Sequence, residues 1–318
     1  MTPARRPRPV LRRASRPGDL PLSFAQQRLW FLDQLVPGNP FYNIQAAWRL
    51  RGRLDRDALA AALAAVVRRH EVLRTRFPAR DGRPVQVVEP VGATALQVVD
   101  LAGAEAEAEA GRLAAETFAT AFDLSVGPPW QARLLRLDAL DHVLVLTLHH
   151  IVFDAWSLGV LARELGALYE ARLAGRPSPL APLAVDYADY AIWERELLGG
   201  GALASGLDHW RRRLAGAPPV LDLPADHARP PRPSYRGGRV GFAVPDAAAR
   251  RLRDLSRSAG TTLYMTVLAA FQVLLGRYAG AEDVVVGSPM ANRSPRVLED
   301  LVGCFVNMVA LRADLSGD

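Results

Sequence analysis

Apolar and polar residues repeat along the chain with two different spacings, and each spacing predicts its own kind of element. Apolar residues three and four positions apart indicate helices, here over 23–35, 55–70, 105–122, 158–173, 186–198, 207–214, 246–259 and 261–278. Alternating or short continuous apolar runs indicate strands, here over 43–50, 72–77, 85–88, 131–137, 142–148, 239–244, 283–287 and 305–312. The helix over 261–278 is apolar on most sides and the run 283–287 is uninterrupted, so we expect both to be buried.

Helices and strands are interspersed through the whole chain, which favours an α/β fold. The length of 318 residues is sufficient for two domains. The Gly- and Pro-rich run 175–182 is the best candidate for a boundary, whereas the Pro-, Arg- and Gly-rich run 216–238 is typical of a surface loop. We therefore expect a basic Pro/Arg-rich tail over 1–20, an N-terminal lobe over 21–176 and a C-terminal lobe over 177–318.

The net charge is concentrated at the N-terminus. The formal net charge is +6, and the first 17 residues contain no acid and six arginines, namely Arg5, Arg6, Arg8, Arg12, Arg13 and Arg16. The rest of the chain is therefore about neutral, which argues against a nucleic-acid-binding surface spread over the fold. We expect the tail to be a disordered linker, with contact to nucleic acid or an acidic partner as the alternative.

Other features of composition bound the class of protein. No apolar run approaches the roughly 20 residues of a membrane span, and the N-terminus lacks the apolar stretch of a signal peptide. The single cysteine, Cys304, excludes an internal disulfide. We expect a cytoplasmic protein with no membrane partner.

The strongest chemical signal is a pair of adjacent histidines at the end of the apolar run 142–148. His149 and His150 are followed by Asp154 and then by helical spacing, and titratable residues at a strand end are common in α/β active sites. On a strand the two histidines point to opposite faces, so only one faces a given cavity, and we expect that one to be His150. A core histidine satisfied by hydrogen bonds is the alternative.

Other kinds of catalytic site lack their residues in this sequence. His150 and Asp154 could supply two metal ligands, but no suitably spaced residue supplies a third. No Gly-x-Ser-x-Gly elbow, P-loop or strand-linked dinucleotide motif occurs. A histidine without a protein nucleophile suits direct transfer, in which one substrate attacks another.

Five segments, in order, carry the motifs of one family: SFAQQRLW from Ser23, RHEVLRTRF from Arg69, HHIVFDAWS from His149, YADYAIW from Tyr187 and VGCFVN from Val302. With them the chain resembles the condensation domain of nonribosomal peptide synthetases, within the chloramphenicol-acetyltransferase-like superfamily. Two further family motifs are absent, so we expect a domain truncated at its C-terminus. The first two motifs most resemble the subtype that joins an L-configured donor to an L-configured acceptor.

The resemblance implies two similar α/β lobes, each with α+β layers, in a V around an active-site tunnel, with the second lobe incomplete here. It implies formation of an amide bond between a donor acyl or peptidyl thioester and the amine of an acceptor aminoacyl thioester, as in nonribosomal synthesis of antibiotics and other secondary metabolites. The implied partners are the upstream donor and downstream acceptor carrier proteins, whose 4'-phosphopantetheine arms hold the substrates, and an adjacent adenylation domain. The domain itself is expected to bind no cofactor or metal.

The resemblance also assigns roles to individual residues. His150 is the expected catalytic residue, either as general base toward the amine or as the group that orients it. His149 is expected to support the loop from the far face. Asp154 is expected to be structural and paired with Arg293, with Arg74 as the second choice.

Residues of lower priority are expected to line the tunnel, namely Ala155, Ser157 and Asn307. Ala155 stands where the family has glycine, and its methyl group is expected to reduce the rate without abolishing activity. Two other functions remain open at this point. One is a stand-alone acyltransferase that uses acyl-CoA, and the other is a non-catalytic carrier-binding module, because a truncated second lobe would leave the tunnel open.

Overall fold

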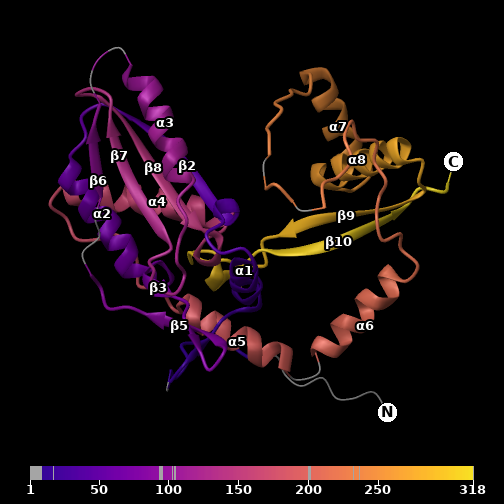
Figure 1. Cartoon of the computed structure of the whole chain (residues 1–318), viewed down its shortest axis with the longest axis horizontal. Helices are drawn as coiled ribbons and strands as arrows, with labels where there is room; N and C mark the ends of the chain where they lie inside the picture. Colours follow the sequence, from indigo (N-terminus) through magenta and orange to yellow (C-terminus); the bar gives the residue numbers. More distant parts are fainter. Residues whose placement is uncertain are drawn as a thin grey trace. The chain divides into compact units, whose positions relative to one another are not determined.

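The computed structural model describes residues 9–16, 18–92, 96–101, 103, 105–199, 202–231, 233–235 and 237–317. The chain divides into two compact units, Met1–Ala202 with Ala291–Asn307, and Leu203–Met290 with Met308–Asp318 (Figure 1). The division differs from the boundary expected at residue 176. The reason is that the segment after it belongs to the core of the first unit, where Val185, Tyr187 and Tyr190 are buried.

A four-stranded sheet forms the centre of the first unit. Its strands lie in the order β2-β8-β7-β6, with bounds Asn43–Arg51, Asp141–His149, Trp130–Arg136 and Gln97–Asp100. Strands β7 and β8 are antiparallel neighbours, as predicted, and β2 pairs antiparallel with the other edge of β8. Strand β8 is therefore interior to the sheet, which fixes the position of the histidines at its end.

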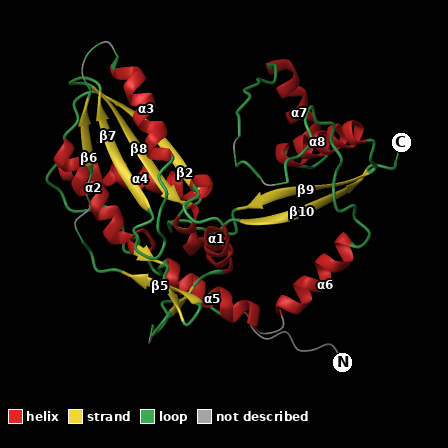
Figure 2. Cartoon of the chain, in the orientation of Figure 1, coloured by secondary structure: helices red, strands yellow, loops and turns green. Residues whose placement is uncertain are grey.

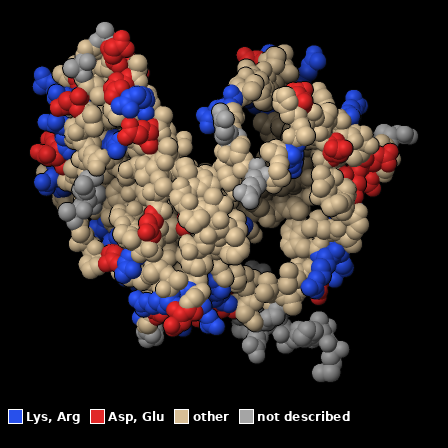
Figure 3. All heavy atoms as spheres, viewed as in Figure 1, with Lys and Arg blue, Asp and Glu red and all other residues tan. Residues whose placement is uncertain are grey.

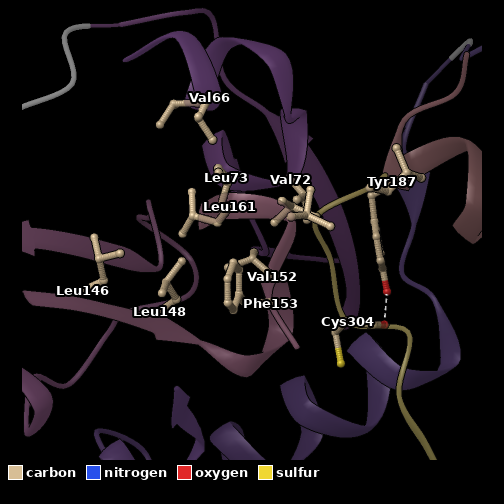
Figure 4. Close-up of a cluster of buried hydrophobic side chains, with 14 of the residues drawn as sticks. Val66, Val72, Leu73, Leu146, Leu148, Val152, Phe153, Leu161, Tyr187 and Cys304 are labelled. Carbon is tan, nitrogen blue, oxygen red and sulfur yellow. Dashed lines mark hydrogen bonds between the residues drawn. The ribbon is translucent and has the colours of Figure 1, made fainter. Parts of the chain in front are cut away.

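Helices cover both faces of this sheet (Figure 2). Helices α2 (Arg56–Arg69) and α4 (Ala155–Leu173) pack on the face that carries Leu144, Leu146 and Leu148. Helix α3 (Ala106–Phe118) packs on the opposite face, against Leu135 and Val145. Burying one leucine side chain stabilises a fold by about 1.5–3 kcal/mol, so the alternation of β8 across its two faces anchors the strand firmly (Figure 4).

Smaller elements of the first unit surround the end of β8. Helix α1 (Phe24–Leu35) begins at a capping box in which Ser23 and Gln26 exchange hydrogen bonds. Helix α5 (Tyr187–Gly199) follows the predicted helix over 186–198. A second, small sheet contains β1, β5, β3 and β4, which span Leu20–Pro21, Arg83–Val88, Thr75–Arg76 and Ala79–Arg80. In the described part of the chain, 3₁₀ turns span Pro40–Tyr42, Glu71–Arg74, His150–Val152 and Arg296–Leu298.

The second unit contains helices α6 (Ala202–Leu214, of which Ala202 is counted with the first unit), α7 (Asp246–Ser258) and α8 (Leu263–Ala279), and most of strands β9 (Asp283–Met290) and β10 (Asn307–Asp314). The strands pair with each other. Among the described residues no single helix is both long and apolar enough to cross a bilayer. Helices α7 and α8 reach that threshold only when taken together, and they are bent by 109° at the break between them.

Three predictions about elements are wrong in whole or in part. The run 72–77 begins in the 3₁₀ turn Glu71–Arg74, where Leu73 N donates to His70 O and Val72 and Leu73 are buried, so only Thr75–Arg76 (β3) forms a strand. The run 239–244 has no strand partner among the described residues, and Val240 is 90% exposed. Helix α8 is not buried: Phe271 is 46% exposed, because α7 and the β9/β10 pair cover only one side of it among the described residues of this unit.

The described part of the basic tail, residues 9–16, lies against α5 and is not a free linker. Trp193 Nε1 donates to Pro9 O at 2.7 Å, and Arg16 pairs with buried Asp189 at 2.9 Å and with Glu71 at 2.5 Å. Arg5, Arg6 and Arg8 lie outside the described residues. On the face shown in Figure 3, acidic and basic side chains are interspersed over the first unit, as expected for a nearly neutral body.

Candidate active site at the end of strand β8

The two adjacent histidines separate at the point where β8 ends. His149 is the last residue of the strand, and its backbone N–H still donates to Pro129 O at 2.8 Å. His150 begins a 3₁₀ turn, His150–Val152. His149 is buried, whereas His150 is half-buried. Only His150 is therefore open enough to meet a substrate.

His149 has a structural environment. Its Nδ1 accepts a hydrogen bond from Ile151 N at 3.2 Å, so it caps the turn that carries His150. The ring of Tyr42 lies edge-on to it, with centroids 6.5 Å apart. Burial, and secondarily the neighbouring His150, lowers the pKa of His149 to about 4. His149 is therefore neutral at pH 7 and holds the turn through a lone pair.

Asp154 is buried and binds the elements around it with both carboxylate oxygens. It is the N-cap of α4, where Oδ1 accepts from Ser157 N at 2.8 Å and from Ser157 Oγ at 2.7 Å. The same oxygen accepts from Arg293 Nη2 at 2.8 Å, and Oδ2 accepts from Phe305 N at 3.1 Å. The ion pair expected between Asp154 and Arg293 is thus present.

Arg293 is buried, and both of its terminal nitrogens have partners, whereas its Nε has no hydrogen-bond partner among the described residues. Its Nη1 donates to two carbonyl oxygens, those of Leu298 and Leu301, each at 2.6 Å, and its guanidinium carbon lies 4.2 Å from the centre of the Phe305 ring. Burial lowers the pKa of Arg293, although the Asp154 charge opposes that shift. The guanidinium is therefore a structural cation that connects α4 with the segment 298–305.

Ser157 was expected to line a tunnel, but its side chain is buried and has structural partners. Its Oγ receives hydrogen bonds from Arg293 Nη2 at 2.9 Å and Gly303 N at 3.1 Å, besides its own bond to Asp154. The residue is 0% exposed, which excludes contact with a substrate.

The segment 302–305 is held by side chains from several elements. Backbone N–H groups of Val302, Gly303 and Phe305 donate to His70 Nδ1, Ser157 Oγ and Asp154 Oδ2, respectively. The carbonyl of Cys304 accepts from the hydroxyl of Tyr187, which also hydrogen-bonds Ser23 Oγ at 2.8 Å (Figure 4). The five sequence motifs thus converge on one place in the first unit, a convergence that their spacing along the chain did not predict.

His70 belongs to a second buried polar cluster that the sequence did not single out. Its Nε2 lies 2.7 Å from Glu164 Oε2, and Arg69 Nε donates to Glu164 Oε1 at 2.9 Å. Burial raises the pKa of Glu164, but hydrogen bonds and charges from His70 and Arg69 outweigh it and leave the pKa lowered. The cluster joins α2 to α4 and to Val302.

Cys304 brings a thiol against the candidate catalytic residue. Its Sγ lies 3.6 Å from Nδ1 of His150. Burial, with a further contribution from the Asp154 charge, raises the pKa of the thiol to about 12. The sequence predicted no role for Cys304, since a lone cysteine within a motif carries no spacing signal.

The remaining predicted residues are Arg74, Ala155 and Asn307. Arg74 does not reach Asp154: it donates to Glu89 O at 2.5 Å and borders an open cavity of about 460 Å³ beside Trp130. Ala155 is the exposed first residue of α4 and has no positive φ, so its methyl group causes no backbone strain. Asn307 is exposed at the start of β10.

The arrangement provides one half-exposed imidazole in a rigid, largely buried frame. Among the described residues no group of three or more His, Cys, Asp or Glu side chains is placed to hold a metal ion. The chemistry that the imidazole of His150 can supply is to move a proton or to orient a reactant by hydrogen bonding.

A family model described as a condensation domain matches residues 17–318. The chain is 48% identical over 307 residues to a linear gramicidin synthase protein of Brevibacillus parabrevis, an alignment that covers 96% of this chain and 6% of the relative. It is 42% identical over 317 residues to a dimodular nonribosomal peptide synthase of Bacillus subtilis, which covers 98% of this chain and 13% of the relative. The chain therefore spans only a small part of each of these relatives.

Solved structures show the same fold. One is the X-domain in a complex with OxyB from teicoplanin biosynthesis, with a TM-score of 0.88 and 37% identity over 98% of this chain and 69% of that one. Another is the first condensation domain of the calcium-dependent antibiotic synthetase in complex with a substrate analogue, with a TM-score of 0.78 and 25% identity over 94% and 70% of the two chains.

Proposed function

Because the chain belongs to the condensation-domain family, we propose that it forms the amide bond between two substrates held as thioesters on carrier proteins. The amine of the acceptor aminoacyl thioester attacks the carbonyl of the donor acyl or peptidyl thioester. The C–N bond forms, the C–S bond breaks, and the extended chain stays on the acceptor carrier. The observation that carries the proposal is the half-exposed His150, the first residue after β8, in the turn capped by buried His149.

His150 is the residue that acts on the reactants in this proposal. As a general base it would take the amine proton, a contribution typically worth about 10²–10⁴-fold in rate. As an orienting group it would hold a reactant by a hydrogen bond, and positioning two reactants together is worth up to about 7–11 kcal/mol in well-aligned systems. Both roles need the rigid frame supplied by Asp154, Arg293 and His149.

Ala155 modifies the rate in this proposal. It stands where the family has glycine, at the exposed start of α4. We infer that its methyl group narrows a close approach to the backbone there, and that this slows the reaction without abolishing it. An Ala155→Gly variant that forms product at the unchanged rate would contradict this inference.

The partners follow from the family. The relatives are parts of multidomain synthetases, which implies neighbouring carrier proteins and an adenylation domain. We propose that 4'-phosphopantetheine arms of the carriers present both substrates and that an L-configured donor is joined to an L-configured acceptor. A cytoplasmic location stays a prediction.

The test uses the purified chain with two carrier proteins, one loaded with an L-aminoacyl donor and one with an L-aminoacyl acceptor. We expect dipeptidyl product on the acceptor carrier, detected by intact-protein mass spectrometry, and its loss in His150→Ala. A D-configured donor should react more slowly. Product formation unchanged in His150→Ala would overturn the proposal.

One observation favours a second candidate, a non-catalytic binding module. The X-domain with a TM-score of 0.88 to this chain was solved in complex with OxyB. If this chain recruits a partner in the same way, it will bind carriers or an accessory protein without turnover. Activity on free acyl-CoA and a free amine would instead favour the stand-alone acyltransferase.

A further inference from the structure

The structure places the thiol of Cys304 against Nδ1 of the His150 ring. Its Sγ lies 3.6 Å from Nδ1. Cys304 is 0% exposed and His150 is half-buried, so the contact is partly shielded from water. Nothing in the family motif requires a thiol for the reaction proposed above, and the thiol's place suggests that it acts through the histidine.

Hydrogen bonds on both sides of Cys304 fix the backbone that carries this thiol. Phe305 N is bound to Asp154 at 3.1 Å and Gly303 N to Ser157 at 3.1 Å, one on each side of Cys304. The Cys304 carbonyl is held by the Tyr187 hydroxyl, and in Figure 4 the sulfur points away from that hydroxyl. The backbone of Cys304 therefore cannot move away from His150 without breaking contacts that hold α4 and α5.

The direction of the hydrogen bond follows from the chemistry of the two groups. An imidazole nitrogen with a free lone pair is a good acceptor, whereas a thiol sulfur is a weak one. The raised pKa of Cys304, about 12, keeps the thiol protonated at neutral pH. The thiol hydrogen therefore points to Nδ1, since the reverse arrangement would leave it without an acceptor among the described residues and use the poorer acceptor.

We propose that Cys304 is a positioning residue whose thiol donates to Nδ1 of His150 and holds the neutral imidazole in the tautomer that carries its proton on Nε2. The inference rests on the proposed function and selects between the two roles left open for His150. A neutral imidazole with Nε2–H has no lone pair on that nitrogen, so it cannot accept the amine proton there. It donates a hydrogen bond instead.

The step that follows balances without a protein base. Nε2–H donates to the donor thioester oxygen, where negative charge develops as the amine attacks. The C–N bond forms, the C–S bond breaks, and the proton leaves the amine nitrogen for the departing thiolate of the donor arm. The thiol of Cys304 stays protonated throughout.

The direct test is the tautomer of His150, measured on the full chain labelled with ¹⁵N-histidine. Long-range ¹H–¹⁵N correlation spectra distinguish Nε2–H from Nδ1–H rings, and His150→Gln assigns the signals among the six histidines. We expect the Nε2–H form in the wild type and in Cys304→Ser, whose hydroxyl also donates. Cys304→Ala and Cys304→Val, which lack a donor, should shift toward the Nδ1–H form.

A wild-type ring in the Nδ1–H form, or the same tautomer in Cys304→Ala and Cys304→Val as in the wild type, would overturn the proposal. Unfolding curves identify any variant that fails to fold, and the remaining variant then decides. This measurement needs no substrate. Failure of the proposed function would therefore appear as absent product with an unchanged Nε2–H signal, which is distinguishable from failure of the Cys304 inference.

Activity provides a second readout. Losing a neutral hydrogen bond should lower kcat for amide formation in Cys304→Ala by about 2- to 10-fold, with KM for the loaded carriers unchanged. Cys304→Ser should remain within about 2-fold of the wild type, since it keeps the donor. Equal rates in Cys304→Ala and the wild type would count against the proposal. An equal loss of kcat in Cys304→Ala and Cys304→Ser would also count against it.

Discussion

At the scale of single residues, the site depends on charges that are buried in pairs and on a histidine that is buried without charge. The carboxylate oxygens of Asp154 and the terminal nitrogens of Arg293 all have hydrogen-bond partners within the protein. Removing one partner of such a pair leaves the other charged and uncompensated in a low-dielectric interior. The residues that shape the site are therefore also residues on which stability depends.

Arg293→Gln should lower the free energy of unfolding by about 3–5 kcal/mol, because the Asp154 carboxylate stays buried without its cation. Urea unfolding of the wild type and variant measures this loss. Arg163→Gln is the matched control: its partner Asp300 lies in the same segment, but that pair is exposed and should contribute about 0–1 kcal/mol. Equal losses in the two variants would show that burial is not the cause.

His149 predicts a pH dependence of stability. Its pKa is about 4 in the fold against an ordinary value of 6.5, so protonation favours the unfolded chain. Its contribution is complete above pH 6.5 and is lost as the pH falls toward 4, by about 3 kcal/mol. In His149→Gln, urea unfolding at a series of pH values should lack this loss. If the free energy of unfolding changed equally in the wild type and in His149→Gln between pH 7 and 4, the assignment would be contradicted.

At the scale of elements, side-chain contacts hold together the end of β8, the N-terminus of α4 and the segment 302–305. The N-cap residue of α4 is also the acceptor for Phe305 N, so the helix start and the segment are fixed together. Gly303 is required by this arrangement, since a Cβ there would overlap the ring of Tyr187.

Gly303→Ala should therefore destabilise the fold by about 1–3 kcal/mol, the usual cost of overpacking, and reduce amide formation, because the Cys304 thiol and Phe305 N–H shift together. Gly159→Ala is the control within α4: no atom lies within 4 Å of its added Cβ, and replacing a mid-helix glycine stabilises by up to about 1 kcal/mol. Thermal unfolding and the carrier-based product assay compare the two. A Gly303→Ala protein as stable as the wild type would be inconsistent with the clash.

How far these elements could be read from the sequence depends on what determines each. The period of apolar residues determines α2, β7 and β8, and these were predicted within a few residues. The strand predicted over 72–77 was correct only at Thr75–Arg76, because Val72 and Leu73 fit a 3₁₀ turn as well as a strand and packing in the core decides between the two. The Asp154–Arg293 pair was expected through the family resemblance, whereas the contacts of His70 with Val302 and of Cys304 with His150 join chain segments more than 150 residues apart in sequence.

At the scale of the whole molecule, two segments that are distant in sequence complete the first unit. Its last segment, 291–307, returns from the second unit to complete the site, and residues 9–16 lie along α5. Arginines of the tail neutralise Asp186 and Asp189, which are buried on α5 or just before it. The basic character of the tail is thus partly structural.

The double variant Arg13→Gln/Arg16→Gln should lower the stability of the first unit by about 1–3 kcal/mol, because two buried carboxylates lose charged hydrogen-bond donors. Arg12→Gln is the control, since Arg12 is exposed and forms no ion pair among the described residues. Thermal unfolding followed by circular dichroism measures both. Equal melting temperatures for the two variants would show that the arginines of the tail do not stabilise the unit, as expected for a free linker.

The hydrogen bonds of the segment 302–305 restrict the local opening of the chain at this place. This segment has neither helical nor strand geometry, yet the amides of Val302, Gly303 and Phe305 each end on a buried side chain of another element. Such amides exchange with deuterium only when the surrounding core opens. The segment should therefore exchange as slowly as β8 itself, and a stretch of irregular backbone would mark the most cooperative part of the unit.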